Sequence, residues 1–303
     1  MTSKTHLRTC SLCEATCGIR IQQSPQGDIL SIKGDPDDPF SRGYICPKAT
    51  ALQDLHNDED RLRQPLKKTS SGWQAISWQQ AITEAAEGLQ RVQEAHGRDA
   101  VGSYLGNPNV HNYGNLLFGP MLLRAIGSRN KFSATSVDQL PHHMASYFMF
   151  GHQLQIPVPD IDRTDFLIVM GGNPLASNGS LMTAPDIKNR LKSIRERGGR
   201  ILVIDPRKTE TAGVADEHWF VRPGQDVYLL LSPLYVFTHE LSERLPSLPE
   251  YIDSAPLAPL CAEFKPENTE AVTGIAAEQV RELANSWLTA ESAVCYGRMG
   301  VSV

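Results

Sequence analysis

Apolar residues recur along this chain at two different periods, which together predict alternating helices and strands. Between Trp78 and His96 they recur at helical spacing and stop at Gly97, so this stretch predicts an amphipathic helix. The run Phe166–Met170 is wholly apolar and is followed by two glycines, as expected of a buried strand. A helix predicted at about 185–197 separates it from a similar run at 200–205. Strand and helix therefore alternate, and we expect an α/β fold with helices on both faces of a parallel sheet.

The alternation continues over most of the chain after residue 64. Further helices are predicted at 115–126, 141–150 and 226–239, and further strands at 100–105, 219–221 and 293–297. Residues 1–64 differ, because turn-forming Gly, Pro and Asp dominate and only short alternating runs at 18–22 and 28–33 predict antiparallel strands. We therefore expect a small β-rich domain at 1–64, the first part of an α/β domain at 65–150, and a Rossmann-like α/β domain at 151–303.

Length and charge exclude several classes of protein. At roughly 150 residues per domain, 303 residues correspond to about two domains. The net charge of −5 argues against a broadly basic nucleic-acid binder. No apolar run approaches the roughly 18 residues of a membrane-spanning helix, so we expect no membrane insertion. The first residues contain no apolar export signal, and we therefore expect a cytoplasmic location.

The other end of the chain carries a separate expectation. The sequence stops six residues after the predicted strand at 293–297, without a closing helix or strand. We expect a chain cut within a domain, and a fragment that is inactive by itself.

Four of the six cysteines form the pattern C-x2-C-x3-C-x28-C, followed by Pro47. Three thiolates within eight residues can bind one face of a metal centre, and a fourth from a distant loop can complete it. A cuboidal iron–sulfur cluster needs four such soft ligands. Structural zinc usually takes paired C-x2-C motifs, which the lone Cys46 does not provide. A structural zinc site and four buried thiols without a metal stay as alternatives for this motif. The other two cysteines, Cys261 and Cys295, lie in apolar surroundings typical of core cysteines.

Three loops of the α/β region carry residues suited to a nucleotide. Gly171-Gly-Asn-Pro174 follows a strand, which places it at the carboxyl edge of a parallel sheet, where open α/β folds bind ligands. Asp205-Pro-Arg207 ends the next strand; the acid suits a ribose hydroxyl or guanine edge, and the arginine suits a phosphate. Arg222-Pro-Gly-Gln-Asp226 combines a tight turn with a helix start. An ordinary turn, a surface ion pair and a helix cap would explain the same residues.

The joint order of these motifs resembles the molybdopterin oxidoreductase family, which includes the dimethyl sulfoxide reductases and formate dehydrogenases. The resemblance runs along most of residues 8–303. Besides the first three cysteines it is carried by Cys46-Pro-Lys-Ala49, Met149-Phe-Gly151, Gly171-Gly-Asn-Pro174, Ile204-Asp-Pro-Arg-Lys-Thr209, Val221-Arg-Pro-Gly-Gln-Asp226 and Tyr296-Gly-Arg-Met-Gly300.

The resemblance implies the cofactors and the residues that hold them. It implies one [4Fe-4S] cluster, and molybdenum or tungsten bound by two molybdopterin guanine dinucleotides. The cluster ligands would be Cys10, Cys13, Cys17 and Cys46. The nucleotide contacts would come from Gly172, Asn173, Asp205, Arg207, Gly224 and Asp226. Lys48 would lie on the electron path between the cluster and the pterin; a solvated surface lysine is the alternative.

The segment that delivers a protein ligand to the metal departs from the formate dehydrogenase pattern. Residues 130–141 contain no cysteine, and Gln139 stands where those enzymes have a histidine. This argues against formate oxidation by the usual scheme. Asp138 is the predicted metal ligand, because it lies at a strand-to-helix junction and a carboxylate is a hard donor. Ser136 is the competing ligand, and Asp138 as a plain helix cap is a further alternative.

The function expected from the resemblance is two-electron chemistry on a small-molecule substrate at the metal. Single electrons would pass through the cluster to a redox partner protein or subunit. A histidine on the helix after Asp138, at 142 or 143, would be placed to relay protons. Two alternatives stay open. One is a non-catalytic electron-transfer subunit of the same ancestry, and the other is a zinc-bearing α/β binding module.

Overall fold

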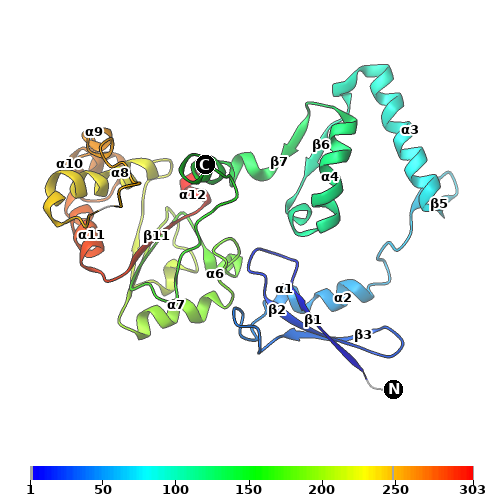
Figure 1. The fold of residues 1–303 in the computed structure, drawn as a ribbon, viewed down its shortest axis with the longest axis horizontal. Helices are drawn as coiled ribbons and strands as arrows, with labels where there is room; N and C mark the ends of the chain where they lie inside the picture. The colour runs from blue at the N-terminus through cyan, green and yellow to red at the C-terminus, as the bar shows by residue number, and fades with distance from the viewer. Residues whose placement is uncertain (1–2, 248, 303) are drawn as a thin grey trace. The chain divides into compact units, whose positions relative to one another are not determined.

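The computed structural model describes residues 3–247 and 249–302 (Figure 1). The chain divides into two compact units, residues 1–134 and 135–303. This division falls between the two boundaries expected from the sequence, and the three-domain description stays a prediction. Within the described residues, no helix combines the length and the apolar character that crossing a membrane requires.

The first unit begins with a three-stranded antiparallel sheet. Its strands lie in the order β1 (Lys4–Thr9), β2 (Gly18–Gln23) and β3 (Ile29–Gly34). The prediction of β2 and β3 is confirmed, whereas β1 was not predicted because most of its residues are polar and exposed. Pairing with β2 along its whole length makes β1 a strand. The short helices α1 (Pro47–Thr50) and α2 (Leu52–Asn57) follow the sheet in sequence, and both lie against β3.

The rest of the first unit combines a hairpin with two longer helices. Helix α3 (Trp78–His96) has the predicted ends, since Ser77 accepts a hydrogen bond from the Gln80 amide and Gly97 ends the helix. The parallel strands β6 and β7 are joined through α4, which ends at Gly127 in a left-handed conformation. The remaining bounds are β4 (Leu66–Thr69), β5 (Gly72–Ala75), η1 (Arg98–Ala100), β6 (Ser103–Leu105), η2 (Asn107–His111), α4 (Tyr113–Ile126) and β7 (Lys131–Ser133).

The second unit is built on a four-stranded parallel sheet, which confirms the predicted α/β class. The strands lie in the order β10 (Glu217–Trp219), β9 (Arg200–Ile204), β8 (Phe166–Met170) and β11 (Ala293–Gly297). The chain proceeds from β8 to β9 to β10 on one side and then returns to place β11 on the other side of β8. The strand order therefore reverses between β8 and β11. Open parallel sheets bind ligands beyond the carboxyl ends of strands at such a reversal.

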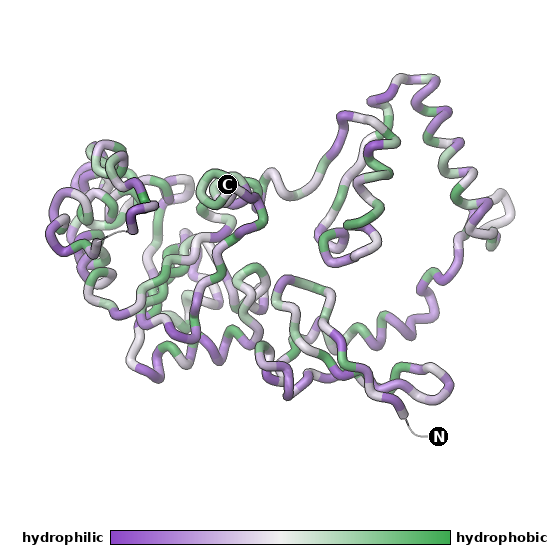
Figure 2. Tube along the Cα trace, in the orientation of Figure 1, coloured by the Kyte–Doolittle hydropathy of each residue, from purple (hydrophilic) through white to green (hydrophobic). Residues whose placement is uncertain are grey.

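Both faces of this sheet are covered, which explains why β8, and β9 after Arg200, are wholly apolar. Figure 2 shows the hydropathy along the chain. On one face Leu167 and Val169 pack against buried residues of α7 (Ile187–Glu196). On the other face the alternate residues of β8 pack against α8 (Asp226–Tyr235) and α11 (Ala277–Thr289). The central strands β8 and β9 thus contribute to the hydrophobic core on both faces of the sheet. Their pairing fixes the positions of their carboxyl ends relative to each other.

The other elements of the second unit connect these layers. The predicted helix at 141–150 is confirmed as α5, while the strand expected directly before the Asp138 junction already ends at Ser133. Residues 134–137 form a 3₁₀ turn, since the Asp138 amide donates to the Thr135 carbonyl at 3.2 Å. The remaining bounds are η3 (Ala134–Val137), α5 (Leu140–Phe150), α6 (Pro174–Ser177), η4 (Ala212–Val214), η5, a π-helical turn (Val236–Glu240), η6 (Ser242–Arg244), α9 (Leu257–Cys261), α10 (Pro266–Thr273) and α12 (Met299–Ser302).

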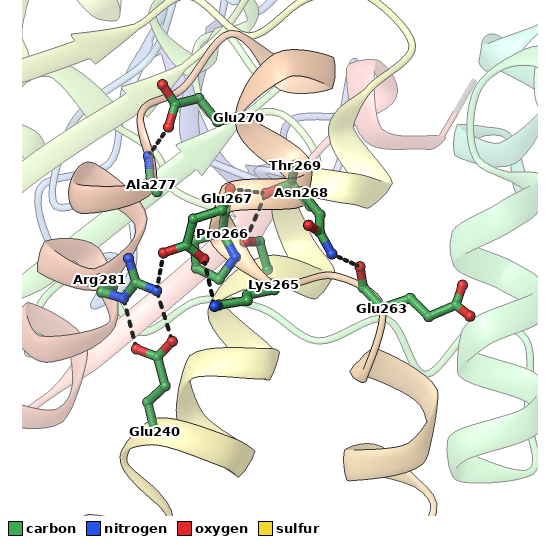
Figure 3. A network of polar contacts seen from close by, with 11 residues as sticks. Glu240, Glu263, Lys265, Pro266, Glu267, Asn268, Thr269, Glu270, Ala277 and Arg281 are labelled. Carbon is green, nitrogen blue, oxygen red and sulfur yellow. Dashed lines mark hydrogen bonds and ion pairs between the residues drawn. The ribbon is translucent and has the colours of Figure 1, made fainter.

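An ion-pair network ties three of these helical segments together (Figure 3). Arg281 of α11 donates two hydrogen bonds to Glu240 of the π-helical turn, at 2.8 and 2.9 Å, and one to Glu267 of α10 at 2.7 Å. The two carboxylates raise the pKa of the Arg281 guanidinium and lie within hydrogen-bonding reach of three of its N–H groups. Because the pairing is bidentate, it fixes the relative orientation of these helical segments as well as adding attraction.

The turns after β8 and β11 touch through their backbones. The Arg298 amide donates to the Met170 carbonyl at 3.0 Å, and the Gly300 amide donates to the Gly171 carbonyl at 3.2 Å. Gly171 has φ +61°, and a Cβ added to it would lie 2.7 Å from the Cα of Gly300. Only glycine fits at both positions without a shift of the backbone.

We expect Gly171→Ala to lower the free energy of unfolding of the second unit by about 2–4 kcal/mol, from left-handed strain and overpacking together. Equilibrium urea denaturation followed by circular dichroism measures the change. Gly213→Ala is the control, because nothing lies within 4 Å of its added Cβ and its φ is not positive. The control should stay within about 0.5 kcal/mol of the wild type. Equal stabilities of the two variants would show that the contact between the turns is loose.

Candidate functional site

The loop that carries the first three cysteines folds back on itself at the end of β1. The Cys10 amide donates to the Cys17 carbonyl at 2.8 Å, which closes the loop at its base. The Thr16 amide donates to the Cys13 carbonyl at 3.2 Å, and Thr16 itself adopts a left-handed conformation with φ 47°. Cys10 and Cys17 are buried, and Cys13 is partly buried. The spacing of the motif is therefore realised as one compact loop.

The fourth cysteine reaches this loop through a close approach of two glycines. A Cβ on Gly34, the last residue of β3, would lie 1.9 Å from the Gly43 carbonyl oxygen. Ser41 strengthens the approach, since its hydroxyl accepts a hydrogen bond from the Gly18 amide at 3.0 Å. The segment leading to Cys46 is thus held against the ends of β2 and β3, and Cys46 is buried at the start of α1.

The thiols of these four cysteines lie close enough to influence one another's pKa. Burial, and after it the neighbouring Cys10, Cys13 and Cys46, raise the pKa of Cys17 to about 11. Burial also raises the pKa of Cys10, while the positive charge of the exposed Lys48 acts in the opposite direction. Thiolates are therefore unfavourable here without a cationic centre, which a metal cluster would supply.

Among the described residues, no group of three or more His, Cys, Asp or Glu side chains is arranged to hold a single metal ion. A cuboidal cluster has a different requirement, because each of its four irons takes one thiolate and the ligands stand at separate corners. The donor set of four soft thiols in one pocket fits such a cluster.

A second group of candidate residues lies at the carboxyl edge of the parallel sheet. Gly172 is buried beside β11, and a Cβ on it would lie 3.1 Å from the Cβ of Arg298. Asn173 is engaged within the protein. Its amide nitrogen donates to Glu210 at 2.6 Å, and its amide oxygen accepts from the hydroxyl of the buried Thr211 at 2.7 Å. Asn173 therefore fastens the loop after β9 to the turn after β8.

The two aspartates of this edge lie close enough to repel each other. Burial raises the pKa of Asp226, the first residue of α8, and the charge of Asp205 raises it further. Asp205 accepts a hydrogen bond from the Arg207 amide at 2.8 Å, while the guanidinium of Arg207 is exposed. Gly224 turns the chain between β10 and α8 with φ +76°. Two adjacent carboxylates with an exposed arginine nearby can accept from the N–H groups of a purine or ribose hydroxyls and can pair with a phosphate.

Asp138 is engaged in an ion pair in this structure. One terminal nitrogen of Arg298 donates to the Asp138 carboxylate at 3.1 Å and to the Gln139 side chain at 2.7 Å. Both charged side chains are only partly exposed, at 22% for Arg298 and 33% for Asp138. Ser136, the competing candidate, lies in the 3₁₀ turn and is exposed. The strand-to-helix junction is therefore attached to the end of β11 by a guanidinium.

A cavity of about 370 Å³ lies beside this ion pair, within the second unit. Its lining includes the polar side chains of Gln139, His142, Asp160, Tyr296 and Arg298. Burial lowers the pKa of His142, and the charge of Arg298 lowers it further although the Gly297 carbonyl opposes the shift. His142 is thus neutral at pH 7, when one ring nitrogen is a donor and the other an acceptor.

Sequence reasoning did not assign a role to Arg298, although it noted the motif that contains it. Arg298 directly follows strand β11, just as Asp205 directly follows strand β9 of the same sheet. This shared position was the sequence feature that could have indicated a role for Arg298. The contact with Asp138 joins residues far apart in the sequence, so no local pattern could indicate it.

Comparison with known proteins decides the family. The family model described as "Molybdopterin oxidoreductase" matches residues 61–249, and that described as "Molybdopterin oxidoreductase Fe4S4 domain" matches residues 3–58. The chain belongs to the molybdopterin oxidoreductase family. The resemblance seen in the sequence is thereby confirmed, as are the family's molybdopterin and [4Fe-4S] cofactors.

Individual relatives agree with this family. Formate dehydrogenase H of Escherichia coli (strain K12) is 27% identical, over 97% of this chain and 41% of the relative. The thiosulfate reductase subunit PhsA of Salmonella typhimurium is 29% identical, over 91% and 36%. The solved structure of acetylene hydratase from Pelobacter acetylenicus has the same fold, with a TM-score of 0.74 and 23% identity over 97% of this chain and 40% of that one. The chain spans about 40% of the length of the first of these relatives.

We expect Asp226→Asn to stabilise the cofactor-free protein at pH 7, by the order of 1 kcal/mol. The pKa of the Asp226 carboxyl is higher in the folded protein than in the unfolded chain. Ionisation of Asp226 therefore destabilises the fold at pH values above the pKa of the unfolded chain. The gain in stability should therefore vanish below about pH 4, the pKa of the unfolded chain. It should grow as the pH rises from that value to the raised pKa of the folded protein. Urea denaturation at several pH values measures it.

The control for this prediction is Asp216→Asn in the same unit. Asp216 accepts a hydrogen bond from the Ile201 amide at 2.8 Å and pairs with Arg195, so its replacement should destabilise the protein at pH 7. A loss of stability in Asp226→Asn as well would mean that the Asp226 carboxylate is satisfied within the fold.

Proposed function

We propose that this chain provides the iron–sulfur and nucleotide-binding part of a molybdenum or tungsten oxidoreductase. Its cofactor would be a bis-molybdopterin guanine dinucleotide, and its electrons would pass through the [4Fe-4S] cluster. The observation that carries the proposal is the pairing of two sites in a member of this family. One is the cluster of four thiols, three of them buried, and the other is the sheet edge where the strand order reverses.

The cluster site is proposed for the first unit. Cys10, Cys13, Cys17 and Cys46 would each ligate one iron, and Lys48 would lie on the path between cluster and pterin. The proposal is supported by the shared burial of the thiols and by the effect of the Lys48 charge on Cys10. A cation beside a cluster of net negative charge favours its reduced form. The cluster would supply one-electron transfer when bound.

The nucleotide site is proposed for the carboxyl edge of the sheet in the second unit. Its contacts would come from Gly172, Asn173, Asp205, Arg207, Gly224 and Asp226. Asp226 supports this assignment best, because a buried carboxylate next to another acid lowers the stability of the free protein and needs a ligand to compensate it. Asn173 would contribute mainly by holding two of the loops together.

Asp138 is proposed as the protein ligand to the metal. It lies at the junction before α5 on a short side chain, and its carboxylate would have to leave Arg298 in order to bind a metal. The metal would supply two-electron redox chemistry when bound. His142, neutral and half-buried on the next turn of the helix, would be placed to hold or accept a proton beside it.

The substrate would be a small molecule and the electron partner a redox protein or a further subunit. Relatives named for formate and thiosulfate support a small substrate, and the name of one of them denotes a molybdopterin-containing subunit. Of the two earlier alternatives, the electron-transfer subunit would need the cluster pocket but neither the nucleotide loops nor Asp138. The zinc-bearing module would contain zinc and show no visible absorption.

We expect the anaerobically purified holoenzyme to be brown, to contain iron and molybdenum or tungsten, and to give an electron paramagnetic resonance signal on reduction. Cys46→Ser should abolish or strongly reduce the visible absorption of the cluster, because one corner loses its thiolate. The matched control is Cys261→Ser, since the buried Cys261 thiol donates to the Leu257 carbonyl at 2.9 Å and a hydroxyl can replace it. Stoichiometric zinc without iron after anaerobic reconstitution would contradict the proposal.

We expect Asp138→Ala in the holoenzyme to remove one oxygen ligand from the metal while the cluster stays intact. X-ray absorption at the metal edge measures the coordination shell, and turnover should fall by at least tenfold. Ser136→Ala is the control and should leave the shell unchanged. The reverse pattern, with the shell altered only in Ser136→Ala, would assign the ligand to Ser136 and refute the role of Asp138.

A further inference from the structure

One buried polar atom of the first unit lies next to the loop of the cluster cysteines. Among the buried side-chain nitrogen and oxygen atoms of the described residues, Nε2 of His111 is the one without a hydrogen-bond partner. It lies 3.6 Å from a carboxylate oxygen of Glu14, slightly beyond hydrogen-bonding distance. A buried polar atom without a partner lowers the stability of a fold, and in native proteins such atoms occur at redox and catalytic sites.

We propose that His111 is a positioning residue of the iron–sulfur cluster. With its proton on Nε2, the ring would hold the Glu14 carboxylate beside the cluster, so that a fixed negative charge lowers the reduction potential of the cluster. The inference rests on the proposed function, because it requires a [4Fe-4S] cluster on the four cysteines.

The first support is the position of Glu14 within the cluster loop. Glu14 directly follows the proposed ligand Cys13, and the Thr16 amide donates to the Cys13 carbonyl at 3.2 Å. This hydrogen bond closes a turn with Glu14 and the buried Ala15 at its centre. The backbone of Glu14 is therefore fixed next to a cluster ligand, and its side chain is the part whose direction has to be set.

The second support is the segment that carries His111, the turn η2 and the start of α4. Its asparagines are hydrogen-bonded within the segment. Asn109 donates to the Gly106 carbonyl at 3.0 Å and accepts from the Asn115 side chain at 2.9 Å. Asn112 caps α4 by accepting from the Asn115 amide at 3.0 Å. His111 is thus mounted on a loop that these bonds hold in shape, and its Nε2 faces the cluster loop.

The third support is a consequence of charge. A carboxylate beside a cluster of net negative charge disfavours an added electron, whereas the positive charge of Lys48 favours it. The Glu14 side chain is 30% exposed, so without a donor it can turn into solvent, where water and salt screen its charge. A movement of about 0.5 Å would bring Nε2 into hydrogen-bonding range and anchor the carboxylate. His111 therefore decides how strongly Glu14 acts on the cluster.

The test measures the reduction potential of the cluster in the anaerobically purified holoenzyme, by a redox titration followed by electron paramagnetic resonance. We expect Glu14→Gln to favour the reduced form at least threefold, which is a rise in potential of about 28 mV for one electron. His111→Leu should also raise the potential, because the carboxylate then turns into solvent. The double variant should match Glu14→Gln, since His111 acts through Glu14. His111→Gln should restore at least half of the shift, because its amide can donate in place of Nε2.

The matched control is His96→Leu, which replaces an exposed histidine at the end of α3 and should leave the potential unchanged. If His111→Leu does not assemble a cluster, His111→Phe takes its place, since it keeps an aromatic ring without the donor.

A wild-type potential in either single variant would overturn the inference. So would a fall in potential in His111→Leu, which would mean that the carboxylate stays in place without the ring, or a double variant that exceeds Glu14→Gln. The proposed function is tested separately, by the iron content and visible spectrum of the wild type. A cluster whose potential does not respond to these substitutions would refute the role of His111 alone, whereas a wild type without iron after anaerobic reconstitution would refute the cluster itself.

Discussion

The contact between the turns after β8 and β11 is the constraint on which the candidate site of the second unit depends. Two strands far apart in the sequence lie side by side, and their carboxyl ends are joined by backbone hydrogen bonds from Arg298 and Gly300. Glycine at 171 and 300 is what allows this approach. The strand order reverses between β8 and β11. The loops that follow the strands on the two sides of this reversal therefore meet at the carboxyl edge of the sheet.

Partly or fully buried charged side chains at this edge of the sheet lower the stability of the cofactor-free protein. Burial and Asp205 both oppose ionisation of Asp226, and the Arg298 guanidinium is held in a partly buried setting by Asp138. Groups of this kind seldom improve stability, because desolvation offsets much of the attraction. Their concentration beyond the ends of the strands, while the two core faces are apolar, is the arrangement expected of a ligand site.

The sequence predicted those parts of the fold that depend on local pattern. The apolar runs of β8 and β9 and the helical spacing of α3 each specify an element without reference to the rest of the chain. Strand β1 could not be predicted in the same way, because only its pairing with β2 makes it a strand. The fold class followed from the alternation of elements, and the family followed from the order of the motifs.

The candidate site was predictable as a list of residues but not as a set of contacts. Loop position indicated Asp205 and Asp226, and the structure brings them together. Asn173 stays a predicted cofactor contact, and its hydrogen bonds to Glu210 and Thr211 are a feature that no local pattern indicated. The attachment of Asp138 to Arg298 depends on the return of β11 to the side of β8, which no local pattern specifies.

The central claim is that the pterin nucleotide binds at the carboxyl edge of this sheet. Hydrogen–deuterium exchange of the complete protein, compared with and without its molybdenum or tungsten cofactor, tests it most directly. The account predicts that the cofactor slows exchange at residues 171–175, 205–211, 222–228 and 298–301, while the exposed helix α3 changes little. Unchanged exchange in all four loops, with protection elsewhere in a cofactor-loaded protein, would contradict it.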